Sequence, residues 1–175
     1  TNYQTGPLFT PPSIATLDGT LGTLHLPGLT GGTNWPGGSF DPETGIFYIY
    51  SKTEVHSLSL VTAPRRSNMD YIMGRPRRPA GDQNERSGRG GLNIEGITIV
   101  KPPWGRITAI DLQSGEILWQ IAHGETPDHI RNHPLLAGID LPRTGVANQR
   151  IGTLVTKTLI VAGDGGLFTA EDGTR

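Results

Sequence analysis

A glycine-rich stretch at residues 31–38 carries the side chains best suited to hold a flat, polar molecule. It reads Gly-Gly-Thr-Asn-Trp-Pro-Gly-Gly, so an amide and a planar indole stand among four glycines. An asparagine amide both donates and accepts hydrogen bonds at a polar ring edge, and an indole offers a flat apolar surface. Asn34 and Trp35 are therefore candidate ligand-binding residues. A glycine-rich turn that places a core tryptophan explains the same residues equally well.

Three histidines form the next candidate cluster: His123, His129 and His133. The last two are four residues apart, a spacing that on a helix can place two imidazoles on one metal ion. No third and fourth ligands are evident in the sequence, and Pro134 interrupts any long helix. We therefore expect histidines at the surface or packed in loops, and no metal site.

Residues 64–92 are rich in arginine and poor in apolar side chains, which predicts a long loop insertion. Such a composition resembles a nucleic-acid-binding tail, which would contact phosphates without reading sequence. However, Tyr71 is the only aromatic ring between Arg65 and Leu92, and the whole chain has a net charge of −1. We therefore expect a solvated loop and no nucleic-acid partner. The segment contains seven of the twelve arginines: Arg65, Arg66, Arg75, Arg77, Arg78, Arg86 and Arg89.

Other catalytic patterns are missing from the sequence. Residues 163–166, Gly-Asp-Gly-Gly, lack the following Lys-Ser/Thr and helix of a phosphate cradle, so they predict a tight hairpin turn. Nothing resembles the Gly-x-Ser-x-Gly motif of a hydrolase nucleophile. The absence of cysteine excludes disulfides, zinc–thiolate sites and thiol nucleophiles.

The elements that must position these residues are short strands. With 25 Gly and 14 Pro in 175 residues, the chain has no stretch suited to a helical bundle. Its longest apolar runs are a few residues, far short of the roughly 20 that a membrane span needs. Thr126 is expected to cap a single helical turn that starts at Pro127. Runs of β-branched and aromatic residues predict an all-β, antiparallel meander with strands at residues 23–26, 46–50, 55–61, 106–110, 117–121, 151–155 and 159–162.

Two of the predicted hairpins look like copies of one unit. Residues 40–48 and 110–118 share the order apolar-Asp-x-x-Thr/Ser-Gly. The Asp and Ser/Thr side chains can bond the amides of the turn, and the glycine supplies a positive φ where the chain reverses. A repeated strand–turn–strand unit favours a repetitive β architecture, with the β-propeller as the first candidate.

Several stretches together resemble the quinoprotein dehydrogenases, β-propeller enzymes that bind pyrroloquinoline quinone (PQQ). The first of these stretches is residues 31–35, followed by residues 40–45. Residues 109–119, Ala-x-Asp-x-x-x-Gly-x-x-x-Trp, match the family's tryptophan-docking repeat. Residues 101–109 and the Leu-Phe-Thr-Pro-Pro stretch at 8–12 are similar to the membrane glucose dehydrogenase branch.

This resemblance implies an incomplete propeller spanning residues 1–175, with 64–92 as an insertion. Propeller blades have four strands and about 40–50 residues each. One antiparallel blade is expected from about residue 34 to 122, and two strands of the next from about 149 to 163. The chain would then hold about one and a half to two blades, as the C-terminal part of a larger dehydrogenase. Unpaired strand edges would favour self-association.

The resemblance also implies chemistry. The family oxidises a sugar or alcohol hydroxyl by hydride transfer to PQQ, with calcium polarising the quinone. It implies that Asn34 hydrogen-bonds the quinone edge, that Trp35 packs nearby, and that the docking residues Ala109, Asp111, Gly115 and Trp119 are structural. The calcium ligands and the catalytic base lie upstream of the Asn34 motif, so no catalytic or metal residue is assigned here.

We therefore expect one wall of a PQQ pocket in a periplasmic glucose dehydrogenase-like enzyme, whose partners are the rest of the propeller and a sugar or alcohol. The isolated chain is expected to be inactive, and PQQ and calcium are expected in the parent enzyme whether or not this chain alone binds them. The alternative is a non-catalytic PQQ-like repeat module that acts as a scaffold and binds no quinone.

Overall fold

The computed structural model describes residues 2–35, 37–76, 92–147, 150–163 and 173. The chain divides into two compact units. The first comprises Thr1–Leu29 and Val55–Leu92, and the second comprises Thr30–Glu54 and Asn93–Arg175. Strands supply nearly all of the described regular structure, so the all-β prediction is confirmed.

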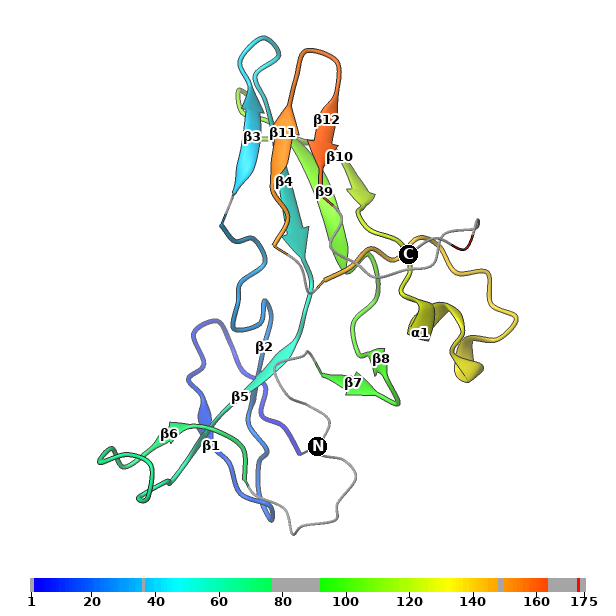
Figure 1. The fold of residues 1–175 in the computed structure, drawn as a ribbon. Helices are drawn as coiled ribbons and strands as arrows, with labels where there is room; N and C mark the ends of the chain where they lie inside the picture. The colour runs from blue at the N-terminus through cyan, green and yellow to red at the C-terminus, as the bar shows by residue number, and fades with distance from the viewer. Residues whose placement is uncertain (1, 36, 77–91, 148–149, 164–172, 174–175) are drawn as a thin grey trace. The chain divides into compact units, whose positions relative to one another are not determined.

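The second unit is built on a four-stranded antiparallel sheet (Figure 1). Each strand pairs with the next one along this path, as in a propeller blade. The strands in spatial order are β3 (Gly38–Asp41), β4 (Ile46–Lys52), β9 (Gly105–Asp111) and β10 (Ile117–Ala122).

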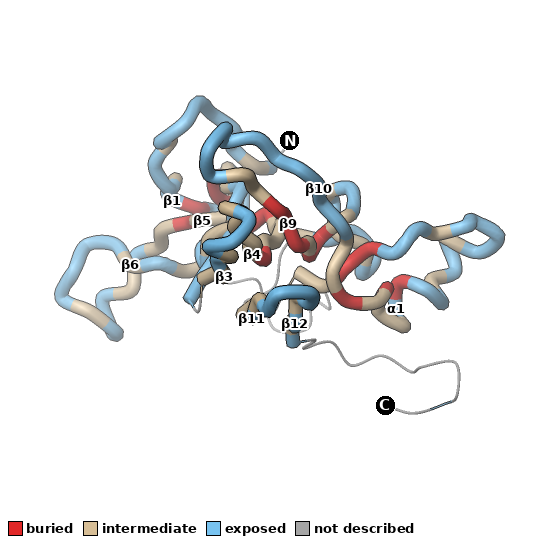
Figure 2. The backbone as a smooth tube through the Cα atoms, turned by 90° about the horizontal axis from the view of Figure 1, so that it is seen from above, coloured by how far each residue is buried: buried red, intermediate tan, exposed pale blue. Residues whose placement is uncertain are grey.

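Strand β9 is the buried centre of this sheet. Ala109 is completely buried and Ile107 is 5% exposed, whereas most of the edge strand β10 is exposed. Figure 2 shows the contrast as a red β9 beside a pale β10. The register between β9 and β10 shifts between Ile117 and Trp119, which marks a β-bulge at this edge.

The two repeated hairpins form as predicted. The Asp41 carboxylate accepts hydrogen bonds from the Glu43 N–H at 3.0 Å and the Thr44 hydroxyl at 2.6 Å, and Gly45 has a φ of +74°. In the second hairpin the Asp111 carboxylate accepts from the Gln113 N–H at 2.8 Å. The two turns therefore share the local chemistry that their common sequence indicated.

A second sheet begins after the blade. It consists of β11 (Thr153–Val155) and β12 (Ile160–Ala162), which form an antiparallel pair. The Ser39 and Thr153 hydroxyls lie 2.7 Å apart, so β11 contacts β3, as Figure 2 also shows. One four-stranded blade followed by two strands of another is an incomplete β-propeller, as expected. The hairpin turn predicted at 163–166 falls on residues outside the described ones, apart from Gly163.

The first unit differs from the predicted meander. Its central strand β5 pairs antiparallel with β2 and β6, but its pairing with β1 is parallel. The antiparallel prediction holds for the pairings of β5 with β2 and β6, and the one parallel pairing of β5 involves the two-residue strand β1, which the sequence pattern did not indicate. Strand β6 lies inside the predicted 64–92 loop, and residues 77–91 lie outside the described ones. The strands are β1 (Ser13–Ile14), β2 (Thr23–His25), β5 (His56–Val61) and β6 (Ile72–Met73).

Short elements complete the second unit: β7 (Asn93–Ile94), β8 (Ile97–Thr98), α1 (Asp128–Arg131) and the 3₁₀ helix η2 (Pro134–Leu136). None of the described helices is long and apolar enough to span a bilayer. The predicted cap of α1 is wrong by one residue, because Pro127 occupies the N-cap position and offers no side-chain hydrogen bond. The Thr126 hydroxyl is buried and accepts from the Thr144 N–H at 3.2 Å instead.

Candidate functional site

The glycine-rich loop at residues 31–37 leads directly into β3. It is fastened to the end of the neighbouring strand β4, where the Lys52 N–H donates to the Gly32 carbonyl at 2.6 Å. Gly31 and Gly37 have φ values of +75° and +82°, a backbone region that side-chain-bearing residues rarely adopt. The Gly37 N–H also donates to the Asn34 carbonyl at 2.8 Å, so the loop has a backbone hydrogen bond near each of its ends.

Asn34 helps to close this loop. Its side-chain N–H donates to the Thr30 carbonyl at 3.0 Å, and its side-chain oxygen accepts from the Trp35 N–H at 2.8 Å. An amide group has two N–H bonds and two acceptor lone pairs, so these contacts leave one donor and one acceptor on Asn34. Because Asn34 is exposed, both remain accessible to a bound molecule.

Trp35 stands beside Asn34 with 88% of its surface exposed. A tryptophan with that exposure contributes little to the core of this chain, so its indole is open to a partner molecule or a neighbouring segment. Its indole offers a large, flat, solvent-exposed ring one residue after Asn34. These two residues fit a planar ring system with polar edges.

Sequence reasoning missed a group of charged residues at the same end of the sheet. Lys52 and Glu54 form an ion pair at 3.2 Å, with side chains only 9% and 14% exposed. The Arg106 guanidinium, at the start of β9, donates to the Thr53 hydroxyl and to the Pro103 carbonyl. The signal for this group in the sequence was Lys52, a charged residue at the end of the largely apolar strand β4.

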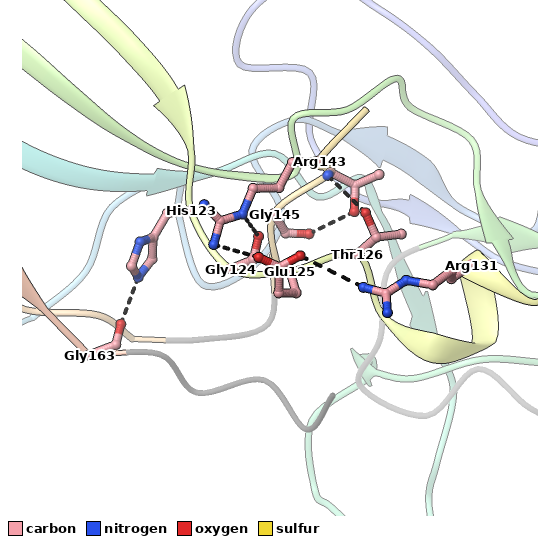
Figure 3. A network of polar contacts seen from close by, with 9 residues as sticks. His123, Gly124, Glu125, Thr126, Arg131, Arg143, Gly145 and Gly163 are labelled. Carbon is pink, nitrogen blue, oxygen red and sulfur yellow. Dashed lines mark hydrogen bonds and ion pairs between the residues drawn. The ribbon is translucent and has the colours of Figure 1, made fainter. Parts of the chain in front are cut away.

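A polar network fixes the chain after β10 (Figure 3). Glu125 pairs with Arg143 at 2.8 Å and with Arg131 at 3.7 Å. The Arg143 Nε donates to the Gly124 carbonyl at 3.2 Å. These side chains are one third to one half exposed, so we interpret the network as a fastening of α1 and the following loop.

The three predicted histidines do not converge. The His123 ring bonds the Gly163 carbonyl at 2.7 Å, and the His133 ring bonds the Glu95 carbonyl at 2.8 Å. His129 is exposed on α1. Within the described residues, no three His, Cys, Asp or Glu side chains gather where they could hold a metal ion.

Two residues of the docking repeat, Ala109 and Trp119, lie in one row across the sheet with Tyr48. Ala109 is the register partner of both Tyr48 and Trp119, so the three side chains share a face. The Tyr48 and Trp119 ring centroids are 5.8 Å apart, with planes tilted by 37°. Asp111 and Gly115 form the turn that precedes Trp119.

The family described as "PQQ: Glucose/ethanol/alcohol dehydrogenase, beta-propeller domain" matches residues 1–173. The chain belongs to this family. Membership confirms the resemblance to quinoprotein dehydrogenases and agrees with the incomplete propeller described above. It also implies PQQ as the family's cofactor, whose planar quinone suits the exposed Trp35 face and the spare hydrogen-bonding capacity of Asn34.

The chain is also similar to two curated proteins. These are glycerol dehydrogenase large subunits from Gluconobacter thailandicus and from Gluconobacter oxydans (strain 621H). Each is 28% identical over 134 residues, a match that covers 64% of this chain and 16% of the relative. In each relative, the matched region is therefore a small part of a much longer protein.

Proposed function

We propose that this chain supplies one wall of the PQQ pocket in a dehydrogenase that oxidises a sugar or alcohol hydroxyl. The observation that carries the proposal is the 88% exposure of Trp35 in a loop that is fastened to β4. The preceding residue, Asn34, has one hydrogen-bond donor and one acceptor left for a ligand. When bound, PQQ supplies the electron-accepting quinone that takes the hydride from the substrate.

The chain's own contribution is binding and orientation. Asn34 would donate to an oxygen at the quinone edge through its second N–H, while Trp35 would stack on the ring plane. The fastened loop would hold both groups in place before the cofactor arrives, which lowers the entropy cost of binding.

The substrate class follows from two sources. Residues 101–109 resemble the glucose dehydrogenase branch, and the curated relatives are named for glycerol. Glucose and glycerol are both polyhydroxylated molecules, so we propose that the substrate is an aldose or a polyol. No catalytic base or calcium ligand is assigned in this chain, and we therefore expect the isolated chain to show no turnover.

The remaining partners follow from the incomplete propeller. We propose that the rest of the propeller packs beside this blade in the periplasm, and that the isolated chain self-associates through the exposed edges of its sheets. Sedimentation at micromolar concentration tests this: a stable compact monomer would contradict it.

The direct test is calorimetric titration of the chain with PQQ, with and without added calcium ions. We expect saturable binding that weakens about two- to tenfold in Asn34→Ala, the usual cost of one lost hydrogen bond. Trp35→Ala should weaken it by about tenfold or more through loss of stacking surface. Trp119→Phe is the matched control, because it alters a tryptophan of the same unit away from this loop.

A non-catalytic scaffold is the second candidate. It is favoured by the local contacts of Asn34, which show that the residue already stabilises its own loop. Unaltered PQQ binding in both Asn34→Ala and Trp35→Ala, or no binding by the full-length parent protein, would favour this candidate.

A further inference from the structure

The first unit contains a cavity of about 660 Å³ that the dehydrogenase function does not explain. Ligand pockets commonly have volumes of about 300–1,000 Å³, so its size suits a small molecule. It opens among the ends of β1, β5 and β6 and the turn that follows β5. Its described lining includes Arg65, Arg66, Arg75 and Tyr71.

Backbone hydrogen bonds hold two walls of this cavity in place. The Ala15 N–H donates to the Leu60 carbonyl at 2.9 Å, which fixes the segment after β1. The Gly74 N–H donates to the Ser59 carbonyl at 3.0 Å, and the Ser59 hydroxyl donates back to the Gly74 carbonyl at 2.6 Å. A Cβ on Gly74 would lie 2.7 Å from a Val61 methyl, so this close approach requires glycine. The cavity is thus preformed.

The charge around the cavity has one sign. Three arginines and no acidic residue appear among the described residues that line it. The sequence of the first unit holds seven basic and four acidic residues, whereas the second unit holds eight basic and twelve acidic ones. The positive charge is therefore concentrated in the unit that contains the cavity, although the whole chain is nearly neutral.

Arg65 and Arg66 differ from the arginines of the second unit. Arg131 and Arg143 both pair with Glu125. No carboxylate of the described residues lies within ion-pair distance of Arg65 or Arg66, and both are exposed at the cavity. Their guanidinium groups are therefore available to an external anion.

The geometry points to a binding site for a small, doubly charged oxyanion, either a phosphate group or a dicarboxylate. Guanidinium groups present forked donors that match carboxylate and phosphate oxygens. The Tyr71 side chain, which also lines the cavity, adds a hydrogen-bonding group and an aromatic face for the rest of the molecule. This site lies in the first unit, whereas Asn34 and Trp35 belong to the second.

The test is a titration of the isotope-labelled chain followed by amide NMR. Inorganic phosphate and succinate are added separately, with sodium chloride at equal ionic strength as the reference. We expect saturable shifts at Ala15, Thr16 and Thr62 with at least one of the two anions and none with chloride. The anion that saturates identifies the source of the negative charge.

The variants decide whether the arginines are responsible. Replacing both by glutamine (Arg65→Gln, Arg66→Gln) should weaken binding by at least about tenfold, the loss expected for charge-assisted hydrogen bonds. The lysine pair (Arg65→Lys, Arg66→Lys) keeps the positive charge but loses the forked donors of the guanidinium group. Its anion affinity should lie between those of the parent chain and the glutamine pair. Arg150→Gln, which removes an exposed arginine from the second unit, should bind like the parent chain.

Three results would overturn the inference. The first is no saturation by either anion up to about 100 mM. The second is equal weakening in the glutamine pair and in Arg150→Gln, which would indicate a general charge effect. The third is tight binding of a duplex oligonucleotide without saturable shifts from the small anions, which would indicate a nucleic-acid surface.

Discussion

The hydroxyl of Thr153 lies 2.7 Å from the hydroxyl of Ser39, although 114 residues separate them in the chain. Thr153 donates its hydrogen to the Tyr48 carbonyl at 3.2 Å, so Ser39 must donate the hydrogen of the shorter bond, because a hydroxyl has only one. Two consecutive hydrogen bonds therefore join β11 to the four-stranded blade, at the seam where the next sheet begins.

Thr153→Val tests this seam. Valine has nearly the same shape, but it removes both hydrogen bonds and leaves the Tyr48 carbonyl without that donor. We expect a loss of about 1–3 kcal/mol in the free energy of unfolding. Urea denaturation measures the loss, and hydrogen exchange should locate it at β11. Thr5→Val, at an exposed position of the first unit, is the control and should change neither the free energy of unfolding nor the hydrogen exchange at β11. Equal effects in the two variants would refute the role of Thr153.

Ala109→Leu tests the packing at the centre of the blade. Ala109 is completely buried and has Tyr48 and Trp119 as its register partners, so no space remains for three more carbon atoms. Overpacking of this kind costs about 1–3 kcal/mol. Thermal unfolding of the variant should show it, whereas Ala137→Leu at an exposed position should leave the midpoint unchanged. A stable Ala109→Leu variant would show that the two rings can separate easily.

Thr44→Val tests the turn between β3 and β4. The Thr44 hydroxyl, and then the Glu43 N–H, hold the pKa of Asp41 below its ordinary value of 3.8. Because the pKa is lower in the folded state, Asp41 stabilises the fold above pH 3.8, and that stabilisation is lost as the pH falls through the folded pKa. NMR titration of the Asp41 carboxyl should show a higher pKa in Thr44→Val, and Ser51→Ala in β4 should leave it unchanged. An unaltered pKa in Thr44→Val would contradict the assigned cause.

A pair of glycine variants separates backbone strain from steric conflict. A Cβ would meet no atom within 4 Å at either Gly115 or Gly163, but only Gly115 has a left-handed φ, of +76°. Gly115→Ala should therefore destabilise the chain by about 1 kcal/mol, while Gly163→Ala should have little effect. Comparison of the two urea midpoints measures the difference. Equal midpoints would show that the turn relaxes without cost.

Local chemistry explains the successful sequence predictions. The turns at Asp41 and Asp111 use contacts within four residues, so their sequences determine their shape almost alone. Every predicted strand appears, with ends shifted by up to two residues, because runs of β-branched and aromatic residues favour extended backbone wherever they pair. Residue types also located the candidate loop at residues 31–37. They did not predict the hydrogen bond from the Lys52 N–H that fastens this loop to β4.

Competition between partners explains the errors. Thr126 has the side chain of a good helix cap, but the buried Thr144 N–H takes its hydroxyl, because an unpaired buried donor costs more than an uncapped single turn. Strand β1 is parallel to β5, and no pattern in two residues could reveal that direction.

The sequence alone determined the β character of this chain, its repeated hairpins and its family, because each depends on residues close together in the chain. The tertiary structure alone decided which strands are neighbours: β5 joins β1, β2 and β6, while β4 pairs with β9 across more than fifty intervening residues. It also decided that Trp35 faces solvent and that Arg65 and Arg66 line a cavity. Strand partners and exposure depend on burial between distant segments, which no local pattern encodes.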